Sequence, residues 1–333
     1  MTMFSKYLVT GATGFLGRAV IGELMKENAE IYALVQDGDV FAGELPASVH
    51  IVYGDVCEIA SLKKFFSHAD QQTCVIHCAG IVSVASHPGD IIYRVNVGGT
   101  SHVLYYCHRH NVGQLIYVSS VHAIPKKLQW TEITEDTFFS PNLVQGDYAK
   151  SKAIATGLVM NAAACGLNTS VVFPSGLIGP NDIAKGSITS MLQSFIAGKL
   201  PLAVKGGYDF IDVRDVAAGI IACAKKGKRG HGYILSGQYA SIRDILEIVK
   251  ETLHVKRNVF YLPVRIAKLI APIYEKWCLR KHRPLFFTPE SVAVLASGAR
   301  FCRISSEEEL KFIPRKLEES IRDTALWLRY ARR

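Results

Sequence analysis

Short apolar runs alternate with amphipathic stretches through the first half of the chain, and this alternation predicts strands and helices in turn. Runs rich in β-branched residues predict strands at 7–10, 31–35, 50–53, 74–77, 115–118 and 169–173. The stretches with helical spacing predict helices at 14–27, 61–68, 90–110 and 148–165. Strands that are apolar throughout are typical of a parallel sheet covered on both faces. The fold class we expect is therefore α/β, a doubly wound parallel sheet that binds its ligand at the carboxyl ends of the strands.

The pattern changes after Pro174. Residues 176–208 are rich in Gly, Pro and Ser, with one helix expected at 187–197. A strand at 210–216 and a helix at 217–225 follow, and we expect segment 209–236 to return to the sheet. From Ser241 onward, helices are interrupted by prolines. The chain is thus divided into a main domain at 1–175 and a smaller, mainly helical cap formed by 176–208 and 237–333.

Composition and charge narrow the class of protein. Hydrophobic residues make up 49% of the 333 residues and charged residues 20%, which excludes a disordered or collagen-like chain. The net charge is +9, but the cations are spread out, with only short clusters such as 225–229 and Arg332-Arg333. We interpret them as a solvated surface rather than a nucleic-acid site. The apolar stretch 216–224 is too short to span a membrane, and structured sequence beginning by Lys6 leaves no room for a signal peptide.

The cysteines indicate a reducing compartment. There are eight, and none forms a Cys-x-x-Cys pair. Cys74 and Cys78 flank His77, but they lie in and just after an expected strand, so we predict buried thiols and no metal site. The protein is expected to be soluble and cytoplasmic, with a small-molecule substrate, no nucleic-acid partner and no stable membrane insertion.

A glycine-rich loop follows the first strand. In Gly11-Ala12-Thr13-Gly14-Phe15-Leu16-Gly17 the glycines allow a tight turn, close approach of the backbone to a pyrophosphate, and close packing of helix on strand. The free N–H groups and positive dipole end of the helix would hold the phosphates. In this strand–turn–helix context the motif predicts that residues 1–175 form a Rossmann dinucleotide-binding domain and that the cap binds the substrate.

Tyr148 and Lys152 are four residues apart and therefore share one face of a helix. A phenol with a pKa near ~10 is a poor proton shuttle at neutral pH, whereas a nearby ammonium favours the phenolate. The pair thus has the chemistry of a general acid/base. An exposed Tyr and Lys on an amphipathic helix would be the structural alternative.

The order of these motifs resembles the extended short-chain dehydrogenases/reductases of the NAD-dependent epimerase/dehydratase superfamily. The resemblance covers nearly the whole chain and is nearest to the dihydroflavonol reductase and 3β-hydroxysteroid dehydrogenase branch. The motifs that carry it are 11–17, Gly54-Asp55-Val56, His77-Cys78-Ala79-Gly80, Asn96-Val97-Gly98-Gly99-Thr100, Tyr117-Val118-Ser119-Ser120, Tyr148-Ala149-Lys150-Ser151-Lys152, 173–180 and 212–217.

The resemblance implies roles for individual residues. Tyr148 would be the general acid/base, Lys152 would also hold the nicotinamide ribose, and Ser120 would orient the substrate oxygen. The cofactor contacts it implies are Gly11, Thr13, Gly14, Phe15, Leu16, Gly17, Arg18, Gln36, Asp55, Val56, Ala79, Gly80, Asn96, Tyr148, Lys152, Pro174 and Gly176.

Several neighbouring residues have a structural alternative. Ser119 competes with Ser120 but is expected nearer the cofactor or in a structural role. His122 is expected to be solvated or hydrogen-bonded in its loop. Asn96 is equally suited to bridging backbone groups. Asp212 and Asp215 are expected to fix a turn and cap the next helix.

The end of the second strand bears on which nicotinamide cofactor binds. An acidic residue there would bond the ribose 2′-hydroxyl and repel a 2′-phosphate, but the position holds Val35. Gln36 follows, Asp37 lies one residue further, and Arg18 could reach a 2′-phosphate. The pattern favours NADP(H) and leaves NAD(H) possible.

Three functions fit the resemblance. The first is an NAD(P)-dependent oxidoreductase that interconverts a carbonyl and a secondary alcohol on a bulky, largely apolar substrate. The second is a nucleotide-sugar epimerase or dehydratase, which the absence of an acidic residue after Ser120 and the presence of Phe173 disfavour. The third is a non-catalytic cofactor sensor, which would commonly lack the Tyr/Lys pair.

The cap is rich in large apolar residues, most of which we expect in the core and some in a substrate pocket. They are Phe195, Tyr208, Phe210, Phe260, Tyr261, Ile266, Tyr274, Trp277, Phe286 and Phe287. Segment 264–283 is amphipathic and basic, which favours a lid helix over a membrane-surface helix and leaves a phosphate- or CoA-bearing substrate open. A homodimer through the helices at 90–110 and 147–165 is possible.

Overall fold

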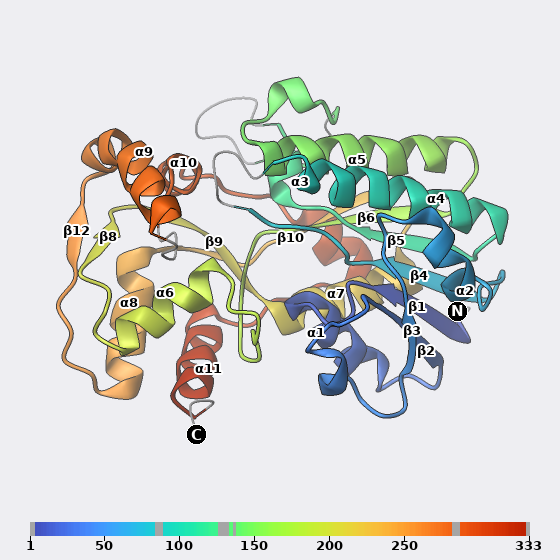
Figure 1. The fold of residues 1–333 in the computed structure, drawn as a ribbon, viewed down its shortest axis with the longest axis horizontal. Helices are drawn as coiled ribbons and strands as arrows, with labels where there is room; N and C mark the ends of the chain where they lie inside the picture. Colours follow the sequence, from blue (N-terminus) through green and yellow to red (C-terminus); the bar gives the residue numbers. More distant parts are fainter. Residues whose placement is uncertain (1–3, 84–88, 126–132, 136–137, 282–286, 331–333) are drawn as a thin grey trace.

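The computed structural model describes residues 4–83, 89–125, 133–135, 138–281 and 287–330. Seven parallel strands form its central sheet, in the order β10-β6-β5-β4-β1-β2-β3 (Figure 1). They are β1 (Lys6–Thr10), β2 (Glu30–Val35), β3 (His50–Tyr53), β4 (Thr73–His77), β5 (Gln114–Val118), β6 (Thr169–Pro174) and β10 (Gly232–Leu235). This confirms the α/β class and the doubly wound, Rossmann-like sheet predicted from the apolar runs.

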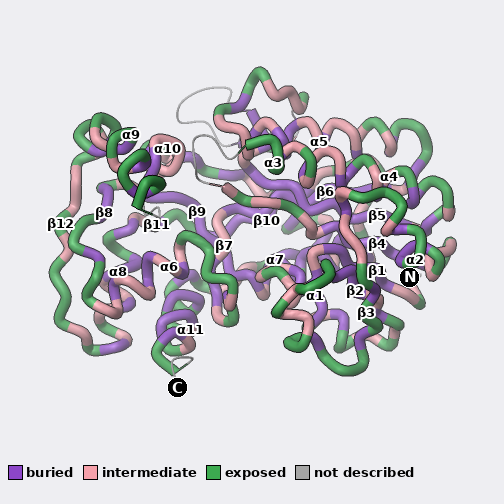
Figure 2. Tube along the Cα trace, in the orientation of Figure 1, coloured by how far each residue is buried: buried purple, intermediate pink, exposed green. Residues whose placement is uncertain are grey.

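Both faces of the sheet are covered, which explains why its strands are apolar throughout. Tyr7 and Val9 of β1 point into the core beneath α1 and α7, while Leu8 points into the core beneath α2 and α4. All three are at most 1% exposed, and buried residues follow the central strands in Figure 2. The helices on the sheet are α1 (Phe15–Leu24), α2 (Leu62–Phe66), α3 (Ile91–Tyr93), α4 (Thr100–Arg109), α5 (Asp147–Ala164) and α7 (Val213–Lys226).

The helix expected at 90–110 is divided. Between α3 and α4, residues Arg94–Gly99 form a wider π-helical segment. Gly99 packs directly on Val56, where an added Cβ would lie 2.8 Å from the valine Cγ2. The hydroxyl of Thr100 donates to the Asn96 carbonyl at 2.7 Å. Wider turns of this kind are frequent at functional sites, and this one carries Asn96.

The cap is mainly helical, as predicted, but it also contains two small sheets that the sequence pattern did not predict. One has the order β11-β9-β7, and the other pairs β12 with β8. Their strands are β7 (Gly176–Ile178), β8 (Leu202–Val204), β9 (Gly207–Asp212), β11 (Gln238–Ser241) and β12 (Phe260–Leu262). The helices are α6 (Ser187–Ile196), α8 (Ile242–Leu253), α9 (Val264–Arg280), α10 (Pro289–Ala296) and α11 (Leu317–Tyr330).

Segment 209–236 differs from the expectation in its boundaries and in its pairing. β9 ends at Asp212, and α7 begins at Val213, because the Asp212 carboxylate accepts the backbone N–H of Arg214 at 2.8 Å and so caps the helix. β9 pairs within the small sheet, whereas β10 pairs with β6 at the edge of the large one. Only the end of this segment therefore lies in the central sheet.

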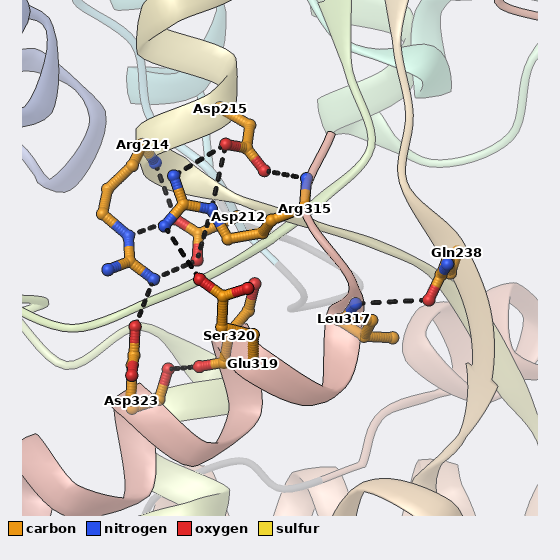
Figure 3. A network of polar contacts seen from close by, with 10 residues as sticks. Asp212, Arg214, Asp215, Gln238, Arg315, Leu317, Glu319, Ser320 and Asp323 are labelled. Carbon is orange, nitrogen blue, oxygen red and sulfur yellow. Dashed lines mark hydrogen bonds and ion pairs between the residues drawn. The ribbon is translucent and has the colours of Figure 1, made fainter. Parts of the chain in front are cut away.

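A polar network joins α7 to the C-terminal helix α11 (Figure 3). Arg315, just before α11, donates to Asp215 of α7 from Nε at 2.9 Å and from Nη2 at 2.8 Å. Arg214 donates to both Asp212 and Asp323, each at 2.7 Å. The network fixes the last helix of the cap to a helix that packs on the central sheet.

Among the described residues, no helix is both long and apolar enough to cross a bilayer.

Candidate active site

The glycine loop has the geometry that its sequence predicts. Gly11 has a φ of +66°, and an added Cβ there would lie 2.7 Å from the backbone nitrogen of Ala79. At Gly17 a Cβ would lie 2.0 Å from the Gly11 carbonyl oxygen. Only glycine permits these approaches, which bring the first turn of α1 against the residues that follow β4.

The same loop fits a dinucleotide pyrophosphate. The N-cap of α1 is the exposed Gly14, with no side chain capping the helix and no acidic residue in its first turn. The N–H groups and the positive dipole end of α1 therefore face an open, uncapped surface that suits phosphate oxygens. When bound, a nicotinamide dinucleotide supplies a hydride donor or acceptor.

Asn96 joins the loop after β4 to α5 through hydrogen bonds. Its amide nitrogen donates to the Ile81 carbonyl at 3.0 Å and to the Ser151 hydroxyl at 2.9 Å, and its oxygen accepts the Ile81 N–H at 2.8 Å. The residue is 1% exposed. This bridging of backbone groups matches the structural alternative for Asn96 and fixes the position of Ala79 and Gly80.

Lys152 lies beneath this loop. Its ammonium donates to the Val118 carbonyl at 2.8 Å and lies 5.1 Å from the centre of the Tyr117 ring. A Cβ added at Gly80 would approach the ammonium to 3.2 Å. The side chain of Lys152 is withdrawn from water, and this burial lowers its pKa to about 8.

Tyr148 and Ser120 are brought together from different elements. Tyr148 is in the first turn of α5, while Ser120 follows β5. Burial raises the pKa of the Tyr148 phenol, and the nearby Ser120 side chain acts in the opposite direction. The sequence-based argument that a lysine ammonium lowers this pKa is not supported here, because the Lys152 ammonium binds the Val118 carbonyl.

Ser119 and Ser120 have different surroundings. The Ser119 hydroxyl is buried beneath α5, 2.6 Å from the hydroxyl of Thr156. The Ser120 hydroxyl accepts the His122 N–H at 3.2 Å and faces Tyr148. The geometry therefore gives Ser119 a structural place and leaves Ser120 at the candidate site.

His122 is packed into the site through its ring. The ring stacks on Tyr208 of β9 with 5.5 Å between centres, and Tyr208 Oη lies 3.2 Å from His122 Nε2. The same imidazole meets the Tyr148 ring edge-on at 5.9 Å. The sequence offered His122 as a loop histidine and Tyr208 as one of many cap aromatics. It gave no signal that the two would meet, because they lie 86 residues apart in the sequence.

Residues at the ends of β2 and β3 also converge. Gln36 donates to Asp55 at 3.0 Å. Thr13 donates to Asp39 at 2.6 Å, and Arg18 donates to the carbonyls of Thr13 at 2.9 Å and of Asn181.

The remaining predicted cofactor contacts lie at the ends of other strands. Val56 follows β3, and its side chain is buried against Gly99. Pro174 ends β6, and Gly176 begins β7, where a Cβ would lie 3.0 Å from the Asp209 carbonyl. The predicted contacts Gly11, Asp55, Val56, Ala79 and Gly80 thus follow the carboxyl ends of parallel strands, where α/β sheets bind ligands.

The cysteines and histidines do not gather into a metal site in the described parts of the chain. All eight cysteines are free, and Cys74 is buried. His77 lies 2.7 Å from the Thr10 hydroxyl and 3.1 Å from that of Thr100, and burial lowers its pKa to about 3. A neutral histidine between two hydroxyls is a structural bridge between β1, β4 and α4.

The cap aromatics have mixed surroundings. Phe195, Tyr208, Phe210 and Phe287 are buried as expected, whereas Phe260, Ile266 and Trp277 are exposed. Phe286, Arg283, Arg332 and Arg333 lie outside the described residues.

A doubly wound sheet, a glycine loop at its first crossover and a Ser–Tyr–Lys set after β5 and in α5 together define a class, the nicotinamide-dependent enzymes of the extended short-chain dehydrogenase/reductase type. The model of the NAD dependent epimerase/dehydratase family matches residues 7–236. The chain belongs to this family.

Named relatives identify the type of reaction. The chain is 27% identical to sterol demethylase protein B of Methylococcus capsulatus, over 97% of this chain and 98% of the relative. It is 26% identical to sterol-4-alpha-carboxylate 3-dehydrogenase, decarboxylating, of Schizosaccharomyces pombe, over 96% of each. A ketoreductase of Stigmatella aurantiaca that acts on a farnesylated quinoline oxide is 26% identical over 80% of this chain and 79% of its own. With this family and these relatives, the chain is an NAD(P)-dependent oxidoreductase.

Solved structures share the whole architecture. The structure of gox2253 superposes with a TM-score of 0.84 at 25% identity and covers 98% of both chains. UDP-glucose 4-epimerase of Thermotoga maritima has a TM-score of 0.78 at 15% identity, covering 98% of this chain and all of its own. The second likeness shows the fold alone.

Proposed function

We propose that the protein interconverts a carbonyl and a secondary alcohol on a bulky, largely apolar substrate, with Tyr148 as the general acid/base. The observation that carries this proposal is the contact between Tyr148 and the segment that begins at Ser120: the N–H of His122 donates to the Ser120 hydroxyl at 3.2 Å, and the His122 ring meets the Tyr148 ring at 5.9 Å. This contact supports a phenol and a hydroxyl that both reach one substrate oxygen. Ser120 would orient that oxygen, and Tyr148 would give or take its proton. Lys152, anchored on Val118, would hold the nicotinamide ribose.

The aromatic side chains beside Tyr148 support the proposal of an apolar substrate. His122 and Tyr208 present stacked rings there, and two full-length relatives are named for sterols. Position 173, where nucleotide-sugar epimerases often carry an asparagine, holds a phenylalanine that is 0% exposed and stacks on Phe139 at 5.4 Å. It offers no amide to a nucleotide sugar, so the epimerase alternative is disfavoured.

The test is the substitution Tyr148→Phe. Removing one hydroxyl keeps the ring packing, so we expect reduction of apolar ketones to fall by at least about a hundredfold, because general acid/base groups typically contribute that much. Binding of the nicotinamide cofactor, followed by its fluorescence, should stay within about twofold of wild type. Turnover equal to wild type would exclude Tyr148 as the acid/base. Tyr93→Phe is the matched control. It also removes one tyrosine hydroxyl, which is hydrogen-bonded to Asp147, the neighbour of Tyr148 on α5.

For the cofactor we propose a preference for NADP(H). It is supported by Val35, 1% exposed at the end of β2, and by Gln36 in place of a carboxylate. Arg18 is half-buried, directly follows the glycine loop and donates to the Thr13 carbonyl. The Asp39 carboxylate bonded to Thr13 works against a 2′-phosphate.

Parallel fluorescence titrations with NADPH and NADH test this preference. NADPH should bind more tightly, and Arg18→Ala should weaken NADPH more than NADH, because only NADPH carries the 2′-phosphate. Equal losses for both cofactors would mean that Arg18 only holds the loop, and tighter NADH binding would reverse the preference. Arg94→Ala removes a cation from the π-helical segment instead. It is the control for a general effect of losing one positive charge.

We also propose a homodimer through α4 and α5 and a cytoplasmic location. Eight free cysteines support a reducing compartment.

A further inference from the structure

Helix α9 has two unlike faces. Ala267, Ala271 and Cys278 are 0% exposed, and the two alanines pack in the small core formed with β8 and α10. On the other side Leu269 is 76% exposed and Ile273 72%. In Figure 2 much of α9 has the colour of exposed residues.

The exposed apolar residues of α9 form a continuous stripe. Ile266, Leu269, Ile273 and Trp277 are spaced by three or four residues, so they line one side of the helix. Large apolar side chains exposed together, unlike single ones, mark a surface that is covered by something.

The exposed charged residues of α9 itself are all positive. The cations of α9 and its C-cap are all exposed, and within the described chain none of them forms an ion pair. They are Arg265, Lys268, Lys276, Arg280 and Lys281. The one acidic residue of the helix, Glu275, is 6% exposed on the buried face. The exposed face of α9 therefore has no negative charge of its own.

We propose that α9 docks peripherally on an anionic lipid surface, with its apolar stripe at the acyl boundary and its cations among the headgroups. An exposed apolar face flanked by Lys and Arg is the physical requirement for such binding. A second copy of this chain fits less well, because a two-fold contact through α9 would bring the two sets of cations together. This inference goes beyond the proposed reaction and does not depend on it.

The docked face is connected to the candidate active site through α10. That helix packs on α9 in the same small core. Its Glu290 lies so close to Gly146 that a Cβ there would be 2.7 Å from the carboxylate, and Gly146 is two residues before Tyr148. If the proposed reaction holds, docking would hold α9, and with it α10, which meets the start of α5, at the surface from which an apolar substrate arrives.

The experiment measures co-sedimentation of the full chain with vesicles of phosphatidylcholine alone or mixed with phosphatidylglycerol. We expect binding to the mixed vesicles, little binding to phosphatidylcholine, and weakening as salt is raised. Leu269→Ser with Ile273→Ser should lower the partition coefficient by at least about tenfold, since each side chain would lose its apolar environment. Lys268→Glu with Lys276→Glu should abolish the preference for anionic vesicles.

Two control variants separate this surface from general effects. Val40→Ser with Ile313→Ser removes equally exposed apolar residues elsewhere, at 84% and 85% exposure, and Lys63→Glu with Lys64→Glu changes charge on α2. Both should bind vesicles like wild type.

The proposal is overturned if wild type binds no vesicles or if the α9 variants bind as wild type does. A third outcome would also overturn it: no vesicle binding, together with a dimer in light scattering that becomes monomeric in the Leu269/Ile273 variant. Activity of each variant on a water-soluble ketone reports on the reaction separately.

Discussion

Lys152 shows at the scale of one residue how burial changes chemistry. The residue is 4% exposed, its ammonium has the Val118 carbonyl as acceptor, and burial lowers its pKa from 10.5 to about 8. The spacing of Tyr148 and Lys152 suggested a lysine that lowers the pKa of Tyr148. The structure instead shows a lysine whose own pKa is lowered by its surroundings, while burial raises that of the tyrosine.

Cofactor binding should therefore depend on pH. Below pH about 8 the Lys152 ammonium is charged and can hold the ribose hydroxyls; above it the free protein loses that proton. The dissociation constant for NADPH should be flat below this pH and rise by up to about tenfold per pH unit above it. Fluorescence titrations across this range would measure the change.

Lys152→Met should bind NADPH more weakly, with no rise near pH 8. Lys150→Met, two residues away on α5, should keep the wild-type profile. A wild-type affinity that does not change through pH 8 would contradict a role for the Lys152 ammonium in binding.

At the scale of elements, an ion pair joins the first turn of α7 to Arg315, just before α11. Asp215 is 8% exposed and accepts three hydrogen bonds from Arg315, two from the guanidinium and one from the backbone N–H. Both guanidinium bonds join groups far apart in the sequence. A carboxylate this buried needs its partner, because an unpaired buried charge is costly.

Arg315→Ala should lower the free energy of unfolding by about 2 kcal/mol, since it leaves Asp215 with only the backbone donor. Arg322→Ala is the matched control: Arg322 pairs with Glu318 on α11, and both side chains are more than half exposed. That variant should change stability by no more than about 0.5 kcal/mol. Urea denaturation would measure both, and equal losses would contradict a special role for the buried pair.

Two elements differ from their sequence pattern for local reasons. The apolar periodicity of 90–110 is helical throughout, but it does not show that Gly99 packs on Val56 or that the helix widens around Asn96. Likewise, the apolar run through Val216 predicts a strand, whereas the Asp212 cap begins the helix at Val213. Hydrogen-bond geometry decides such boundaries, and periodicity alone does not contain it.

At the scale of the whole molecule, the proposed dimer depends on a face of α4 that is only weakly apolar. Tyr105, 48% exposed and bonded by Arg109, is the large apolar residue exposed on that helix. If α4 and α5 pair with those of a second copy, Tyr105→Glu should shift the protein from dimer to monomer, because it places like charges together at the two-fold axis. Light scattering would measure this, and a monomeric wild type would contradict the dimer.

The sequence by itself determined the sheet and the glycine loop, because these depend on short-range patterns. It also predicted the Tyr148/Lys152 pair from its spacing, and Ser120 through the family resemblance. Apolar runs, glycines where no Cβ fits, and a spacing of four are all visible along the chain. Only the tertiary structure decided that His122 meets Tyr208, that Lys152 binds Val118, and that Arg315 meets Asp215. It also left the apolar side of α9 in solvent, where the sequence had favoured a lid. These contacts join residues distant in sequence, and periodicity along one segment carries no information about which surface another segment will cover.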